Sequence, residues 1–248
     1  MISVCMATHN GEKFIKEQLD SILCQLAPDD EVVISDDGST DRTLEIISAY
    51  KDSRIKIYNY KQPTKSKYTH LYVTRNFENS LRHATGEIIF LSDQDDRWLP
   101  NKVSECLFKL KSCDLVIHNL RIADNSLNDI GKNIYERGFV FHDYFICKCA
   151  YYGCAMAFKR HLLDIVLPFP SNLLVHDIWI GLLAESFGRV LYVDEPLIQY
   201  RMLPESASHS VKSNIIHKIS YRLYMLTHLF YRVLRFKCNC SVNPVIVV

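Results

Sequence analysis

The chain has 248 residues, of which 48% are hydrophobic and 23% are charged, and its formal net charge is +1. These values are typical of an ordinary soluble protein with a sizeable core, built as one large domain or as one domain and a tail. No uncharged apolar run approaches the roughly 18 residues of a membrane-spanning helix, so the composition argues against an integral membrane protein.

Charge is distributed unevenly between the two ends of the chain. No Asp or Glu follows Glu205, whereas six Lys and Arg residues do, which leaves a net charge of −5 on residues 1–205. A basic tail therefore follows an acidic body, and the acidic body argues against nucleic acid as a partner. We predict a main domain over residues 1–210 and a basic, amphipathic helical tail over residues 211–248.

The cysteines and the first residues point to a reducing compartment. The closest cysteine spacings among nine are Cys147-x-Cys149 and Cys238-x-Cys240, and neither is the C-x-x-C pair of a structural zinc site. The first ten residues, MISVCMATHN, lack the basic and apolar regions of a signal peptide. We therefore expect reduced thiols in a cytoplasmic protein, with peripheral contact at the inner face of the cell membrane if the tail binds lipid.

Segments with strand and helix patterns alternate along the chain. Apolar runs such as ISVCMA and EVVI predict strands, and apolar residues at helical spacing between them predict helices. Strands that alternate with helices form βαβ units and a mainly parallel sheet, a Rossmann-like α/β fold. In chain order, the predicted elements are strand 2–7, helix 12–26, strand 31–34, a helix from 40, strand 54–59, helix 74–84, strand 87–91, a helix from 100, strand 115–117, helix 177–187 and helix 212–237.

Polar side chains follow three of these strands. Thr8 and Asn10 follow the first strand, Asp36-Asp37 the second, and the acidic run 93–96 the strand at 87–91. Right-handed crossovers bring the carboxyl ends of parallel strands to one edge of the sheet, where ligands of open α/β proteins bind. Each segment taken alone could be a polar turn. Their common position favours a ligand site.

The stretch EIIFLSDQDDRW, residues 87–98, places three carboxylates within four residues at the end of an apolar strand. Like charges this close raise one another's pKa, so a cation is expected beside them. The chain has no P-loop and no G-x-G-x-x-G after the first strand. A Mg²⁺ or Mn²⁺ ion held by Asp93 and Asp95 would then bind the phosphates of a ligand.

Four segments in this order, SVCMATHNG, VVISDDGSTDRT, ATGEIIFLSDQDD and VHDIWIG, resemble the family 2 glycosyltransferases of the GT-A fold. The similarity is greatest to the rhamnosyltransferase-like enzymes that build bacterial surface polysaccharides, and it runs from about residue 2 to about residue 210. It implies an inverting, metal-dependent transfer of a sugar from a nucleotide-diphosphate donor to a glycan acceptor, which can be carried on a lipid. The glycan would be an O-antigen, capsule or exopolysaccharide.

The resemblance also implies roles for residues that bind the donor. Thr8 and Asn10 would line the nucleotide pocket, with Asp36 on the base or ribose and Asp37 supporting the turn. Asp93 and Asp95 match the D-x-D motif of the family, with Asp95 the better metal ligand. Asp96 would flank this pair.

Further roles follow for the second half of the chain. Asp177 matches the catalytic base, with His176 and Trp179 on the acceptor side, and Arg201 would lie near the diphosphate. Relatives often read Tyr-Arg-x-His, where the histidine helps to bind the metal or diphosphate, but this sequence has Leu203 there. His209 lies six residues further on and could substitute for it.

Each of these assignments has a structural alternative. Asp177 could be only a helix N-cap, His176 a structural residue, Trp179 a core wall, and Asp36 and Asp37 turn residues. The tail could pack on the body or lie on anionic lipid. For the whole chain, the alternatives are a sugar nucleotidyltransferase and a non-catalytic GT-A-like binding protein.

Overall fold

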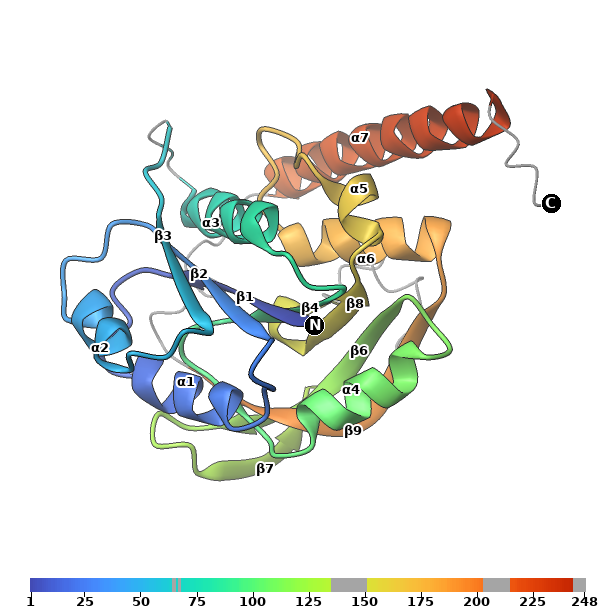
Figure 1. Ribbon diagram of the computed structural model, residues 1–248. Helices are drawn as coiled ribbons and strands as arrows, with labels where there is room; N and C mark the ends of the chain where they lie inside the picture. Colours follow the sequence, from blue (N-terminus) through green and yellow to red (C-terminus); the bar gives the residue numbers. More distant parts are fainter. Residues whose placement is uncertain (64–65, 67, 135–150, 203–214, 243–248) are drawn as a thin grey trace.

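A computed structural model describes residues 1–63, 66, 68–134, 151–202 and 215–242 (Figure 1). The predicted boundary between residues 210 and 211, and the positions of Leu203 and His209, lie outside this described part of the chain.

The described strands form one curled, mixed sheet, which confirms the α/β fold. Its first part is parallel: β3 (Ile55–Asn59), β2 (Glu31–Asp36), β1 (Ile2–Thr8) and β4 (Ile88–Ser92) lie side by side in this order. Only the second part contains antiparallel pairs. The order continues through β8 (Met156–Lys159), β6 (Leu115–Ala123), β9 (Val190–Arg201) and β5 (Arg97–Trp98), and β7 (Asp129–Asn133) pairs with β6.

Helices cover both faces of the sheet (Figure 1). The helices α1 (Ile15–Leu23) and α4 (Lys102–Leu110) lie on one face, and α2 (Thr43–Ala49) packs on α1. The other face carries α3 (Thr69–His83) and α6 (His176–Phe187). Against α6 pack α5 (Leu162–Val166) and the long helix α7 (Ile215–Val242), and a 3-10 turn, η2 (Gly153–Ala155), precedes β8. None of the helices in the described ranges is long and apolar enough to cross a bilayer.

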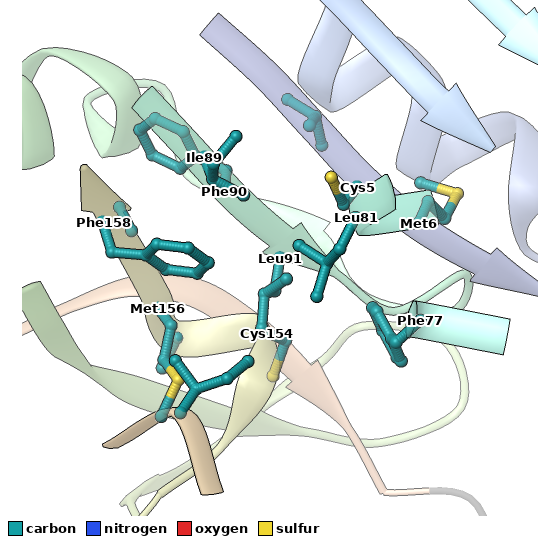
Figure 2. Packing of buried hydrophobic residues seen from close by; sticks show 14 of the residues in the cluster. Cys5, Met6, Phe77, Leu81, Ile89, Phe90, Leu91, Cys154, Met156 and Phe158 are labelled. Atoms are coloured by element: carbon teal, nitrogen blue, oxygen red, sulfur yellow. The ribbon is translucent and has the colours of Figure 1, made fainter. Parts of the chain in front are cut away.

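The core fixes where the parallel strands end. Apolar side chains of β1, β4, β8 and α3 converge in it (Figure 2), and the runs Val4–Met6 and Ile89–Leu91 are completely buried. The parallel register pairs Met6 with Ser92 and Thr8 with Asp36. Burial of the apolar runs therefore brings the polar residues that follow β1, β2 and β4 to one edge of the sheet.

The opposite edge holds a buried carboxylate, Glu31 of β2. Its side chain accepts hydrogen bonds from the Ser3 hydroxyl at 2.5 Å, the Thr85 main-chain N–H at 2.6 Å and the Thr85 hydroxyl at 2.8 Å. Lys56 adds an ion pair at 2.5 Å. Burial alone would raise the pKa of Glu31, but these donors outweigh it and lower the pKa to about 2. Glu31 thereby joins β1, β2, β3 and the loop before β4.

We expect this carboxylate to make stability pH-dependent. The pKa of Glu31 is lower in the folded than in the unfolded chain, so its contribution is complete above pH 4.5 and is lost as the pH falls towards 2. Glu31→Gln should lower the melting temperature at pH 7 and flatten this part of the acid profile. The control is Glu45→Gln, which removes an exposed ion pair with Arg42 and should change little. Equal profiles for both variants would contradict the expectation.

Candidate active site

Three segments that are distant in sequence meet at the edge of the sheet where β4 ends. They are the acidic loop 93–96, the turn η2, and the first turn of α6, which carries Asp177. Gly153 of η2 lies against α6, because a Cβ built on it would be 2.9 Å from His176 Nε2 and 3.8 Å from the Asp177 Cβ. The charge of Asp177 in turn contributes to the raised pKa of Asp93. The structure thus brings together the predicted metal loop and the predicted base.

The acidic loop has the properties of a cation site. One ligand atom each of Asp93, Asp96 and Cys154 lie within 4.8 Å of one another. Burial and the charge of Asp177 raise the pKa of Asp93 to about 6, and burial and the charge of Asp93 raise the pKa of Asp95 to about 7. Asp96 is fully buried, and its Oδ2 has no hydrogen-bond partner in the described part of the chain. A divalent cation would relieve the repulsion and satisfy this oxygen.

The carboxylate oxygens fit Mg²⁺ or Mn²⁺, which prefer hard ligands, better than the Cys154 thiol does. Asp93 belongs to the group of three ligand atoms, as the sequence predicts. Asp96, for which only a flanking place was predicted, belongs to it as well, whereas Asp95 does not. The role of Asp95 as a metal ligand stays a prediction.

A buried lysine that sequence reasoning missed lies beside this group. Lys102 is completely buried, its Nζ donates a hydrogen bond to the Cys154 carbonyl at 2.6 Å, and it lies 4.2 Å from the centre of the Trp98 ring. Burial lowers its pKa to about 8. Lysines of amphipathic helices are usually exposed, so the only sequence signal was its position six residues after Asp96. Its charge faces the carboxylates from inside the protein.

Asp177 lies within the first turn of α6, where Val175 is the N-cap, so Asp177 is not the helix cap. Its Oδ1 accepts a hydrogen bond from the Ile178 N–H at 2.8 Å. Burial raises the pKa of Asp177 to about 7, against the effect of the main-chain N–H donors. A carboxylate with this pKa can accept and release a proton near neutral pH.

His176 and Trp179, the two residues predicted on the acceptor side, have different surroundings. His176 stacks on the Phe77 ring with 4.2 Å between centroids, and burial lowers its pKa to about 3, so its ring is neutral. Trp179 is completely buried and its Nε1 donates to the Val166 carbonyl at 2.9 Å. The predicted acceptor-side position of Trp179 is therefore wrong. Two residues after Asp177 the helix has turned by about 200°, which points Trp179 into the core.

In the structure it is Asp36, rather than Asp37, that holds the turn after β2. Asp36 is buried and accepts hydrogen bonds from the Thr8 hydroxyl at 2.9 Å and from the Ser39 N–H at 2.8 Å and hydroxyl at 2.6 Å. It supports the turn, the role expected for Asp37. Asp37 is only half-buried and accepts from Gln62 at 2.8 Å. A contact of Asp36 with base or ribose stays a prediction, and Asp37 is the more accessible of the two.

Asn10 stands at the centre of the loop after β1. Its φ is +50°, in the left-handed region that asparagine tolerates. Its side-chain oxygen accepts a hydrogen bond from the Thr40 N–H at 2.8 Å, and its own N–H donates to the Ser39 hydroxyl at 2.9 Å. The loops after β1 and β2 are therefore joined. Thr8 is buried, and a contact of Thr8 or Asn10 with a nucleotide stays a prediction.

Arg201, at the end of β9, holds the acidic loop from the protein side. Its guanidinium donates to the Asp95 carbonyl at 2.7 Å, to the Glu17 carboxylate at 2.9 Å and to the Asn125 carbonyl, and its main-chain N–H donates to Asp96 at 3.0 Å. The guanidinium also lies 4.5 Å from the centre of the Phe14 ring. These contacts direct Arg201 to the protein rather than to a diphosphate, so the predicted donor contact is not what the structure shows.

Comparison with known proteins finds a glycosyltransferase family model and glycosyltransferase relatives. The model of the Glycosyl transferase family 2 matches residues 3–165. The dTDP-rhamnosyl transferase RfbG of Shigella flexneri is 30% identical, over 92% of this chain and 81% of that protein. The UDP-Glc:alpha-D-GlcNAc-diphosphoundecaprenol beta-1,3-glucosyltransferase WfgD of Escherichia coli is 26% identical, over 84% of this chain and 79% of that protein.

Solved structures share the fold. S. aureus TarS 1–349 in complex with UDP-GlcNAc superposes with a TM-score of 0.66 at 20% identity, over 86% of this chain and 61% of TarS 1–349. Glucosyl-3-phosphoglycerate synthase from Mycobacterium tuberculosis, in complex with Mn²⁺, UDP and phosphoglyceric acid, has a TM-score of 0.57 at 21% identity, over 82% of this chain and 72% of the synthase.

The contacts of Arg201 generate a prediction about the cation site. A lysine at this position has one nitrogen and cannot reach the three acceptors, so Arg201→Lys should loosen the acidic loop. We expect Mn²⁺ affinity, measured by isothermal titration calorimetry, to fall by about tenfold or more. Arg97→Lys is the matched control, since Arg97 also lies beside Glu17, at 3.9 Å, but is 51% exposed. If the two variants bind Mn²⁺ equally well, Arg201 does not position the loop.

Proposed function

This chain belongs to glycosyl transferase family 2, and on that premise we propose that it moves one sugar, with inversion at the anomeric carbon, from a nucleotide-diphosphate donor to a lipid-linked glycan acceptor. It is a glycosyltransferase of bacterial surface polysaccharide synthesis, as its matches include RfbG, WfgD and the putative teichuronic acid biosynthesis glycosyltransferase TuaG of Bacillus subtilis. The proposal depends most on one observation: Asp177 lies beside the acidic loop at the edge where β1, β2 and β4 end.

The donor side of the reaction would use the loops at this edge. Asn10 and Asp37 would contact the nucleotide, Thr8, which is buried, would support their loops from below, and Asp93 and Asp96, with Asp95, would hold a Mg²⁺ or Mn²⁺ ion. The bound cation supplies charge stabilisation to the departing diphosphate. Arg201 and Lys102 keep the acidic loop in place while the diphosphate arrives and leaves.

The acceptor side would use Asp177. In a single displacement, the acceptor hydroxyl oxygen forms a bond to the anomeric carbon as the bond between that carbon and the diphosphate oxygen breaks. The hydroxyl proton passes to the Asp177 carboxylate, whose raised pKa makes it a competent acceptor near neutral pH. His176 is neutral and adjacent, but its Nε2 is buried beside Gly153, so it would support Asp177 from the protein side. The sugar nucleotidyltransferase alternative requires a Gly-rich, basic loop after β1, whereas the loop here has a single glycine, Gly11.

The α7 helix adds a proposed membrane contact. One side of it packs on the body: Met225 is buried, the Arg232 guanidinium donates to the Ile165 carbonyl at 2.7 Å and to the Pro168 carbonyl at 2.6 Å, and the Leu174 N–H donates to the Tyr221 hydroxyl at 2.9 Å. On this side, α7 therefore packs on the body, which is one of the two alternatives considered for the tail.

The outer side of α7 carries an exposed apolar stripe. Ile219, Leu223, Phe230 and Leu234 recur at helical spacing and are all exposed. The described part of α7 contains basic but no acidic residues, with Arg235 and Lys237 exposed towards its end. Apolar residues flanked by cations fit the surface of an anionic membrane. Such a contact would bring the enzyme to an acceptor carried on lipid.

If Asp177 is the base, its replacement should lower sugar transfer and leave donor binding unchanged. Asp177→Asn should lower sugar transfer by about 10²- to 10⁴-fold, because the amide cannot accept the hydroxyl proton. Donor binding should persist. Release of nucleoside diphosphate from UDP-, GDP- and dTDP-sugars with Mn²⁺ measures turnover, and calorimetry measures binding. Asp164→Asn, an exposed aspartate of α5, should behave as wild type. Unchanged turnover in Asp177→Asn would remove this residue from the base role.

The stripe on α7 predicts lipid-dependent sedimentation. The variant Leu223→Ser with Phe230→Ser should bind vesicles of phosphatidylglycerol and phosphatidylcholine about tenfold more weakly than wild type, because it loses two apolar side chains. Binding to pure phosphatidylcholine, or at high salt, should be weak for both proteins. The matched control is Phe108→Ser, which removes a phenylalanine on α4 that is 62% exposed, close to the 66% of Phe230. Equal vesicle binding by the stripe variant and wild type would contradict the membrane contact.

A further inference from the structure

Gln94, the middle residue of the D-x-D sequence, forms a two-bond bridge to the loop after β1. Its Oε1 accepts a hydrogen bond from the His9 main-chain N–H at 3.0 Å, and its Nε2 donates to the His9 carbonyl at 3.1 Å. The parallel pairing of β1 with β4 ends at Met6 and Ser92. The Gln94 amide therefore continues the connection between the two chains beyond the last strand pair, with both bonds directed to a single residue.

Gly11 makes room for this amide. A Cβ built on Gly11 would lie 2.5 Å from Gln94 Oε1 and 2.7 Å from its Cδ, so any other residue would push the Gln94 side chain aside. The position of Gly11 is itself fixed, because its N–H donates to the Thr43 hydroxyl at 2.7 Å. A glycine here leaves room for the bonded position of the Gln94 amide, which accounts for the glycine in the THNG sequence.

The bridge completes a row of connected loops along the edge of the sheet. On one side, the loop 8–11 is bound to the loop after β2, through Asn10 and through His9 Nδ1, which lies 2.9 Å from the Asp37 carbonyl. On the other side, Gln94 binds the same loop to the acidic loop 93–96. The predicted nucleotide loop and the predicted cation loop are thus held at one spacing.

We propose that Gln94 is a positioning residue that makes cation and nucleoside diphosphate bind cooperatively. The inference rests on the proposed function, in which the two ligands meet. A cation bound by the acidic loop and a diphosphate bound by the nucleotide loop can contact each other only when the loops keep one spacing. Each ligand alone needs only its own loop. Loss of the bridge therefore weakens the complex with both ligands more than either complex with one.

The test is a binding cycle on the full chain by isothermal titration calorimetry. Mn²⁺ is titrated alone and in the presence of saturating UDP, GDP or dTDP, each measured in parallel, and each nucleotide is titrated without metal. The coupling factor is the ratio of the two Mn²⁺ dissociation constants. In Gln94→Ala this factor should fall by about tenfold, within the usual range of coupling energies, while the affinity for each single ligand changes by less than about threefold.

Gln25→Ala is the matched control. The Gln25 amide makes bonds of the same kind, since Nε2 donates to the Leu99 carbonyl at 3.0 Å and Oε1 accepts from the Val103 N–H at 3.2 Å. These bonds join α1 to the start of α4 and do not involve the loops 8–11 or 93–96. Its coupling factor should equal that of wild type, even where thermal stability falls as much as in Gln94→Ala.

Two further variants keep the test independent of folding defects in any one of them. Gly11→Ala displaces the Gln94 amide, so it should lower the coupling factor in the wild-type background but not further in Gln94→Ala. Gln94→Glu can still accept from the His9 N–H, but it places a carboxylate against the His9 carbonyl and should lose coupling as Gln94→Ala does.

The outcomes separate this inference from the function on which it rests. An unchanged coupling factor in Gln94→Ala, or a loss of single-ligand affinity as large as the loss of coupling, overturns the positioning role and leaves the glycosyltransferase intact. Additive effects of Gly11→Ala and Gln94→Ala overturn it as well. If wild-type protein binds neither Mn²⁺ nor any of the three nucleotides, the proposed function fails, and the inference fails with it.

Discussion

Repulsion among closely spaced carboxylates is the constraint around which the site is organised. Asp93, Asp95 and Asp96 follow one strand, and Asp177 is brought beside them by α6. The charged groups that lie behind these carboxylates bind main-chain oxygens, Lys102 the Cys154 carbonyl and Arg201 the Asp95 carbonyl, whereas the Arg201 main-chain N–H donates to Asp96. The loop is thereby held in place without neutralisation of its carboxylates. What completes it is a ligand that brings positive charge, and a divalent cation meets that requirement.

The same arrangement separates the residues proposed to bind the donor from the residue proposed to act on the acceptor. Donor-side residues come from loops after the parallel strands, and bonds between those loops make them one unit. Asp177, the proposed base, comes from the start of α6. Core residues such as Trp179 anchor this helix, and the Trp179 ring also lies 5.3 Å from the Arg232 guanidinium of α7. The helix that carries the base is thus packed against the helix that presents an apolar stripe. In the proposed function, different parts of the chain would therefore bind the donor and bring the enzyme to the acceptor.

Much of the fold could be predicted from local patterns. The strands 2–7, 31–34, 54–59 and 87–91 were recognised because each is a short apolar or alternating run followed by polar residues, and the structure places each within one or two residues. The strands β5 and β8 were missed because two and four residues are too few to show a pattern, and β7 because its sequence DIGKN has neither an apolar run nor an alternation. The helix α3 begins at Thr69, and its predicted start was five residues too late. The reason is that no capping residue marks its first turn.

For the site, the kinds of residue and their order could be read along the chain: carboxylates after β2 and β4, an aspartate at the start of α6, and a resemblance that names the family. These depend on local chemistry and spacing. The partner that each carboxylate faces, by contrast, follows from the folded arrangement. It turned Asp36 inward to hold a turn and Trp179 into the core, directed Arg201 to the acidic loop, and placed Lys102 and Gln94 where no motif pointed. Side-chain direction is set by packing between distant segments, and that packing exists only once the chain has folded.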